Sequence, residues 1–121
     1  MSKTVLIVED NELNMKLFCD LLSAHGYDTL QADDGVVALQ LAREHRPDLI
    51  VMDILLPELS GLEVTKWIKQ DDDLKSIPVV AVTAFSSADE QRRFQDGGCD
   101  AFIPKPISVG SFVSTLEQLM N

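Results

Sequence analysis

Short apolar runs alternate along the whole chain with longer segments of helical spacing, and this alternation constrains the fold more than any other feature. Four of the runs contain no polar residue, which is typical of strands buried on both faces of a parallel sheet. A fifth stretch is mixed, as an edge strand would be. The strands are expected at residues 5–8, 27–32, 49–52, 79–82 and 101–103. Since a helix follows each strand, the pattern predicts an α/β fold, with a five-stranded parallel sheet that has helices on both faces.

Four segments between and after the strands have apolar residues at the spacing of amphipathic helices, at residues 13–25, 36–46, 62–70 and 109–120. A further helix is expected at residues 87–96, which are strongly polar and are followed by Gly97-Gly98. We expect Gly26 and Pro47 to end the first two helices and Asp34 to cap the second. The apolar residues expected to pack are Leu13, Leu17, Phe18, Leu21 and Leu22 in the first helix, Val64, Trp67 and Ile68 in the third, and Phe112, Val113, Leu116 and Leu119 in the fifth.

The composition excludes several classes of protein. The 121 residues carry a formal net charge of −10 and the pI is near 4.4, whereas nucleic-acid binding needs clustered Lys and Arg to contact phosphates. No apolar run approaches the length of a membrane-spanning helix. Cys19 and Cys99 lie far apart and fit no metal-binding motif, so we expect reduced thiols in a cytoplasmic protein. The length predicts one domain over residues 1–121.

Polar side chains follow four of the predicted strands. Glu9 and Asp10 come after the first, Asp53 after the third and Thr83 after the fourth, while the fifth continues through Pro104 to Lys105. The carboxyl ends of parallel strands meet at one edge of the sheet, where ligands bind. Clustered carboxylates repel one another unless a cation is present, and oxygen ligands favour a hard ion such as Mg²⁺, with Mn²⁺ as an alternative. A site of this kind fits phosphoryl transfer to a carboxylate.

The same residues, in this order and at these separations, resemble the receiver domains of two-component response regulators. They are Glu9-Asp10, Met52-Asp53 followed by Pro57 and Gly61, Thr83-Ala84 and Lys105-Pro106. Residues 8–18, 61–67, 78–85 and 105–108 look like the DivK-type single-domain regulators of cell division. The resemblance implies a flavodoxin-like receiver fold, no attached output domain, and a monomer that signals by binding rather than as an enzyme.

The resemblance also implies roles for the acidic residues. Asp53 would accept a phosphoryl group from a phosphohistidine. Asp10 and Asp53 would bind Mg²⁺ directly, together with the backbone carbonyl of Leu55, and Glu9 would act through a metal-bound water.

Three further residues take their roles from the resemblance. Lys105 would pair with Asp53 at rest and with a phosphoryl oxygen afterwards. Thr83 would donate its hydroxyl to another phosphoryl oxygen. Phe102 stands at the family's aromatic switch position, where the ring turns inward as Thr83 moves, although the sequence fits a core aromatic on the last strand equally well.

Two surfaces are expected to contact other proteins. A histidine kinase, a phosphatase or a histidine phosphotransferase would dock beside the phosphoacceptor on Asn14, Met15, Phe18, Pro106 and Ile107. A downstream target would bind the face formed by the fourth helix, the fifth strand and the fifth helix.

One alternative remains open, and two others fit the sequence poorly. The protein could pass its phosphoryl group along a relay without acting on a target. An aspartyl-phosphate phosphohydrolase would carry a second Asp two residues after the nucleophile, where Leu55 stands. A flavin carrier would need a Ser-, Thr- or Gly-rich loop after the first strand, where this chain is acidic.

Leu55 and Phe85 indicate a long-lived phosphorylated state. They stand two residues after Asp53 and Thr83, at positions where regulators often carry polar side chains that orient the hydrolytic water. Two bulky apolar side chains would exclude this water, so we hypothesise slow self-dephosphorylation.

Overall fold

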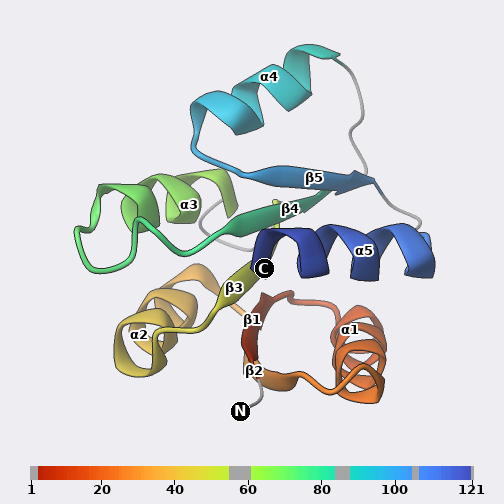
Figure 1. Ribbon diagram of the computed structural model, residues 1–121. Coiled ribbons are helices and arrows are strands. Elements are labelled where there is room, and N and C mark those ends of the chain that lie inside the picture. The colour runs from red at the N-terminus through yellow and green to blue at the C-terminus, as the bar shows by residue number, and fades with distance from the viewer. Residues whose placement is uncertain (1–2, 55–60, 84–87, 105–106, 121) are drawn as a thin grey trace.

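The computed structural model describes residues 3–54, 61–83, 88–104 and 107–120. Strands and helices alternate in the order β1 (Thr4–Val8), α1 (Glu12–Ala24), β2 (Asp28–Ala32), α2 (Gly35–His45), β3 (Leu49–Asp53), α3 (Gly61–Gln70), β4 (Val79–Thr83), α4 (Ala88–Asp96), β5 (Ala101–Pro104) and α5 (Val109–Met120). All the strand pairs are parallel, and the sheet has the order β2-β1-β3-β4-β5 (Figure 1). The predicted α/β architecture is confirmed, including the mixed stretch as an edge strand.

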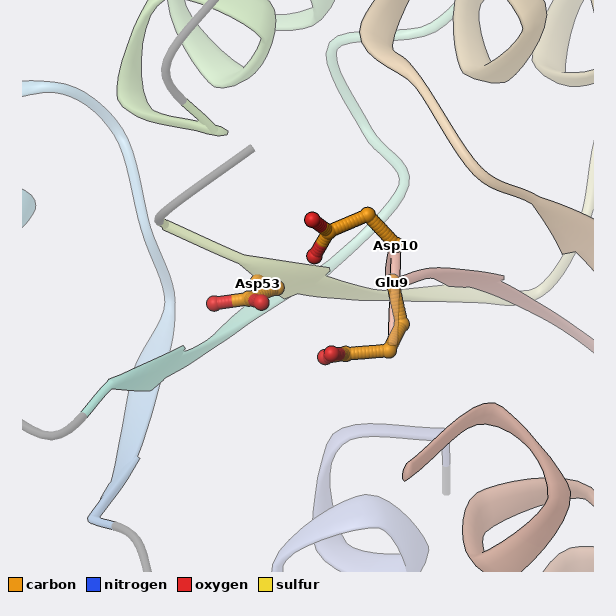
Figure 2. A group of neighbouring side chains, drawn as sticks. All are labelled: Glu9, Asp10 and Asp53. Atoms are coloured by element: carbon orange, nitrogen blue, oxygen red, sulfur yellow. The ribbon is translucent and has the colours of Figure 1, made fainter. Parts of the chain in front are cut away.

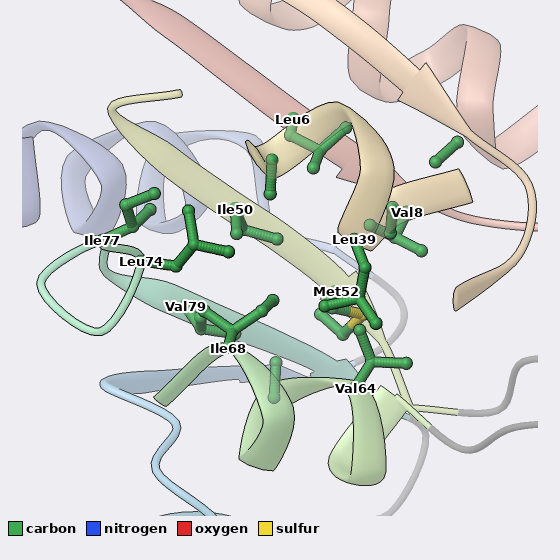
Figure 3. Close-up of a cluster of buried hydrophobic side chains, with 14 of the residues drawn as sticks. Leu6, Val8, Leu39, Ile50, Met52, Val64, Ile68, Leu74, Ile77 and Val79 are labelled. Atoms are coloured by element: carbon green, nitrogen blue, oxygen red, sulfur yellow. The ribbon is translucent and has the colours of Figure 1, made fainter. Parts of the chain in front are cut away.

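The sheet separates two apolar cores because successive side chains of each strand point to opposite faces. In β1, Leu6 and Val8 join the core under α2 and α3, whereas Val5 and Ile7 join the core under α1 and α5. These two pairs of helices lie on opposite sides of the sheet (Figure 1). Figure 3 shows Val64 and Ile68 of α3 facing the strand residues Ile50, Met52 and Val79 in the first core.

The register of the strands aligns their carboxyl ends. Val8 of β1 lies beside Met52 of β3, and Asp53 lies beside Val82 of β4. Thr83 in turn lies beside Pro104 of β5. The residues that follow β1 and those that end β3 and β4 therefore lie at the same edge of the sheet. The helices that follow β1 and β3, α1 and α3, pack on opposite faces of the sheet, and in open α/β sheets ligands bind at such a reversal.

Side-chain caps fix where the first two helices begin. The side chain of Asp34 accepts a hydrogen bond from the Val37 N–H at 2.8 Å, which confirms it as the cap of α2. Asn11 has the same role for α1, through a 3.0 Å bond from the Asn14 N–H. Gly26 follows α1 with φ of +87°, a conformation that glycine adopts without a steric penalty.

Three apolar residues expected to pack in the cores are exposed. Leu13 and Leu17 are 80% and 51% exposed, and Trp67 is 44% exposed. The set of α1 residues predicted to be buried was too wide, because the sheet covers only one side of this helix. On α3 the buried side passes through Val64 and Ile68, which are one turn apart, and Trp67 is rotated away from it.

Two lysines connect elements at the opposite edge of the sheet, where the strands begin. Lys3 Nζ donates to the carbonyl oxygen of Met120 at 2.7 Å and so holds the last turn of α5 beside the start of β1. Lys69 Nζ donates to Ile77 O at 2.8 Å and to Asp100 Oδ2 at 2.9 Å, which joins α3 to the segments entering β4 and β5.

Cys99 is buried beside this lysine contact, in the turn that leads into β5. Burial raises the pKa of its thiol to about 11, and a hydrogen bond with Thr65 partly opposes the shift. The thiol therefore stays protonated at neutral pH.

In the described part of the chain, no helix has the length and apolar composition needed to cross a bilayer.

Candidate metal and phosphoacceptor site

Three carboxylates gather where β1 and β3 end. One oxygen atom from each of Glu9, Asp10 and Asp53 lies within 4.8 Å of the others. Figure 2 shows the three side chains reaching into the same space from the ends of the two strands. The side chains of Glu9 and Asp53 are buried, whereas that of Asp10 is exposed, so the cluster is open to solvent on the Asp10 side. The prediction that these three carboxylates lie close together is confirmed.

Backbone pairing accounts for this geometry. Asp53 is the last residue of β3 and keeps its place in the sheet beside Val82. Glu9 follows β1 directly and donates its N–H to Ala32 O at 3.0 Å, so the strand pairing continues one residue beyond β1. Because successive residues of an extended chain point to opposite sides, Glu9 and Asp10 approach the cluster from different directions (Figure 2).

The beginning of α1 holds the Glu9 carboxylate. Glu9 Oε1 accepts hydrogen bonds from the Asn11 N–H and from Asn14 Nδ2, each at 3.3 Å. Asn11 is also the cap of α1, so the helix start and the carboxylate are fixed by the same few residues. The contact between Asn14 and Glu9 was not predicted from the sequence. The available signal was an Asn at the cap position followed by a second Asn three residues later.

The cluster fits a hard divalent cation. Three carboxylates within 4.8 Å repel one another, and a cation between them removes the repulsion. All the ligand atoms are oxygens, which suits Mg²⁺, and this ion keeps several waters on its open side. The exposed side chain of Asp10 leaves room for such waters.

A cavity of about 570 Å³ opens beside the cluster, between α1 and the start of the β2–α2 connection. Glu9, Asp10, Met15, Gln31 and Asp33 are among its lining residues. The carboxylates can therefore be reached from the side of α1.

Thr83 and Phe102 lie on one face of the sheet. Thr83 is the last residue of β4 and is buried. Phe102 lies on β5 beside Ala81, two residues before Thr83, so both side chains point toward the face that carries α3. Phe102 is partly buried and packs against the core of that face. Thr83 and Phe102 therefore share a face of the sheet, on adjacent strands.

Gly61 brings the start of α3 against the end of β3. Its N–H donates to Ile54 O at 2.9 Å. A Cβ atom at this position would overlap the carbonyl oxygen of Asp53 and lie 2.9 Å from Met52 Cγ. Sequence analysis identified Gly61 only as part of a motif, because a close approach of two backbones leaves no other trace in a single sequence.

The residues expected to dock a partner differ in exposure. Asn14, Met15 and Ile107 are partly buried at the surface. Phe18 is only 1% exposed, and its ring packs against Phe112 with the centroids 5.4 Å apart. The expectation that Phe18 lies on a docking surface was wrong, because it is the residue by which α1 is anchored in the core.

Leu13 and Leu17, not Phe18, are the exposed apolar residues of α1. Four other residues with predicted roles, Leu55, Phe85, Lys105 and Pro106, lie outside the described residues.

The fold and the acidic site together define a class. A family model described as the response regulator receiver domain matches residues 5–117. The chain belongs to the response regulator receiver family, whose members are signalling proteins. Proteins named polar-differentiation response regulator DivK from Brucella anthropi and Brucella ovis are 61% and 59% identical to it over 121 residues, which is all of this chain and 98% of each relative.

Solved receiver structures agree with the fold. The chemotaxis protein CheY4 of Vibrio cholerae is 25% identical, with a TM-score of 0.93 over 98% of this chain and 99% of that one. The receiver domain of the sensor histidine kinase PA1611 from Pseudomonas aeruginosa is 27% identical, with a TM-score of 0.91 over 99% and 98% of the two chains. That structure has a magnesium ion coordinated in its active-site cleft.

Proposed function

We propose that this protein is a single-domain response regulator that accepts a phosphoryl group on Asp53 and then signals by binding another protein. The observation that carries the proposal is the buried Asp53 carboxylate within 4.8 Å of those of Glu9 and Asp10, at the carboxyl edge of a receiver sheet. The donor is a phosphohistidine of a histidine kinase or a histidine phosphotransferase.

Asp53 acts as the nucleophile in this transfer. A carboxylate oxygen of Asp53 forms a bond to phosphorus as the bond between phosphorus and the imidazole nitrogen breaks, and the electron pair returns to the imidazole ring. A loose transition state demands little of the nucleophile, so positioning and charge neutralisation dominate. Mg²⁺ bound by Asp10, Asp53 and the Leu55 carbonyl, with Glu9 acting through a water, would neutralise charge on the phosphoryl oxygens. Mn²⁺ has the same ligand preference.

Lys105 and Thr83 complete the proposed site. The Lys105 ammonium pairs with Asp53 at rest and with a phosphoryl oxygen after transfer. The Thr83 hydroxyl donates to a second phosphoryl oxygen, which draws Thr83 toward Asp53. Phe102 then has space to turn inward, and the face formed by α4, β5 and α5 changes shape.

The output of the switch is a contact with a protein in the control of cell division. This proposal is supported by the two relatives named polar-differentiation response regulator, which have nearly the length of this chain. The two free cysteines suit the cytoplasm as its location.

Phosphorylation with a small donor tests the acceptor. Wild-type protein with Mg²⁺ and phosphoramidate is expected to gain one phosphoryl group by intact-mass spectrometry, and chelation with EDTA is expected to prevent the gain. Asp53→Asn is expected to gain none, whereas Asp33→Asn, which removes an exposed carboxylate near the site, behaves as wild type. An acid-labile phosphoryl group on Asp53→Asn would contradict the assignment.

A relay shuttle is the second candidate, and it needs no allosteric output. Replacing Phe102 with Leu distinguishes a relay shuttle from an allosteric regulator, because it keeps an apolar side chain on β5 and removes the aromatic ring. A shuttle transfers its phosphoryl group to a phosphotransferase at the same rate after this change. An allosteric regulator keeps its phosphorylation rate and loses the phosphorylation-dependent binding of its target.

The lifetime of the phosphorylated state depends on Leu55 and Phe85 in this proposal. Because the two apolar side chains exclude the hydrolytic water, Leu55→Asn and Phe85→Glu are expected to speed the release of inorganic phosphate from purified phosphoprotein, and the double variant more than either single one. Unchanged rates in all three variants would show that water exclusion is not the cause of a long lifetime.

A further inference from the structure

One oxygen atom of the Glu9 carboxylate is held by the first turn of α1. Glu9 Oε1 accepts from the backbone N–H of Asn11 and from the side-chain amide of Asn14, each at 3.3 Å. Both distances are at the long end of the hydrogen-bond range, so each bond is weak by itself. Two donors on the same oxygen nevertheless fix the rotation of the carboxylate about its last bond.

The orientation of the Asn14 amide follows from its neighbour. Only the NH₂ group can face a carboxylate oxygen without repulsion, so Asn14 Nδ2 and not Oδ1 points to Glu9. Its backbone N–H is used separately, in the 3.0 Å capping bond to Asn11 Oδ1. The side chain of Asn14 can therefore be changed while the cap of α1 stays in place.

We propose that Asn14 is a positioning residue for the metal site, which acts by holding Glu9 at the angle at which its carboxylate faces Asp10 and Asp53. The inference rests on the proposed function, since it assumes that the cluster binds Mg²⁺. Hydrogen bonds beyond the direct ligands commonly affect metal affinity strongly. Glu9 would face the metal through a water, and its hydrogen bonds determine the direction in which it holds that water. Asn14 has the geometry of such a residue.

This position of Asn14 also joins the metal site to the surface of α1. Asn14 is partly buried, and the adjacent Leu13 is 80% exposed. A protein that docks on this turn touches the residue that orients Glu9. If docking shifts Asn14, it changes the affinity for Mg²⁺, and Mg²⁺ then changes the affinity for the docked protein by the same factor.

Isothermal titration with MgCl₂ tests the positioning role. Asn14→Leu keeps the size of the side chain and removes the donor, and we expect it to weaken Mg²⁺ binding on the order of tenfold. Asn14→Gln keeps an amide that can reach Glu9, and we expect it to restore most of the affinity. Leu13→Gln is the matched control, because it changes the exposed side chain next to Asn14 without altering any charge, and it should bind Mg²⁺ nearly as wild type does.

Far-UV circular dichroism and urea unfolding of each variant separate positioning from helix loss. Should Asn14→Leu not fold, Asn14→Ala takes its place, since Ala is a strong helix former. Equal or tighter Mg²⁺ binding by the folded variant overturns the inference. If wild type itself binds no Mg²⁺, and Asp53→Asn behaves in the same way, the proposed metal site fails instead.

Discussion

Gly61 shows how a residue without a functional group can belong to a functional site. Its N–H is bonded to Ile54 O, and the place where a Cβ would stand is taken by the carbonyl oxygen of Asp53. The absence of a side chain lets α3 begin directly against the last residue of β3. The position of the Asp53 backbone therefore depends on a glycine in the next element of the chain.

Replacing Gly61 with Ala is expected to displace Asp53. The new methyl group must push apart two backbones, which costs about 1–3 kcal/mol in the free energy of unfolding. Phosphorylation of Asp53 is expected to slow as well. Urea unfolding and the rate of phosphorylation by phosphoramidate measure the two effects.

Gly110→Ala is the matched control for this substitution. A Cβ at Gly110 meets no atom within 4 Å, and Ala is the better helix former, so stability should rise by up to about 1 kcal/mol with no change in phosphorylation. Equal behaviour of the two variants would show that the close approach at Gly61 does not matter for the site.

The site residues that end strands could be predicted from the sequence. The residues that contact them and fix their positions could not. Asp10, Asp53 and Thr83 were found because a buried strand marks its own end and parallel strands place those ends together. Asn14 and Gly61 act through contacts with other residues of the site. A contact of this kind produces no periodic pattern and no bias in composition, so a single sequence does not reveal it.

The helices illustrate the same limit at the scale of elements. Their number, order and approximate bounds followed from apolar spacing together with the residues that end helices, and the cap of α2 followed from the Asp that precedes it. The buried face of α1 did not, because spacing alone cannot tell how much of a helix a sheet will cover. Leu13, Leu17 and Phe18 fit the same stripe, and only packing separates the buried Phe18 from the exposed leucines.

Cys99, which is buried between α3 and β5, is expected to make the free energy of unfolding depend on pH in the alkaline range. Its folded pKa is about 11, raised from an ordinary value of 9.0. Between these values the unfolded chain has released the proton that the folded protein retains, so the free energy of unfolding falls as pH rises. The loss of stability begins near pH 9 and is complete by about pH 11, with a size of about 3 kcal/mol, because each pKa unit corresponds to about 1.4 kcal/mol.

Urea unfolding at several pH values between 8 and 11 measures this loss. Cys99→Ala has a lower stability at pH 8, because it leaves a small cavity, and its stability is expected to fall less steeply with pH than that of wild type. All other ionisable groups are shared by the two proteins, so the difference between the slopes belongs to the thiol. Parallel curves would contradict the assignment.

At the scale of the whole molecule, a net charge of −10 opposes the compact state. The three clustered carboxylates are the part of this charge that a bound cation can relieve locally. We therefore expect Mg²⁺ to raise the free energy of unfolding, by about 1.4 kcal/mol when its free concentration is ten times its dissociation constant.

Sodium chloride at matched ionic strength separates specific binding from screening. Wild type should gain clearly more from MgCl₂ than from NaCl, whereas Asp10→Asn should gain equally from both. Asp28→Asn, which removes a charge where β2 begins, should keep the specific gain. An equal response of wild type to the two salts would leave the cluster without a metal-binding role.

The hydrogen bond between Lys3 and Met120 has a practical consequence. It holds both ends of the described chain at the edge of the sheet where the strands begin, opposite the edge that carries Asp53. A fluorescent protein or an affinity handle attached at either end therefore projects away from the acidic cluster. Tagged forms of this regulator should remain open to phosphorylation, which makes its movements in a living cell accessible to microscopy.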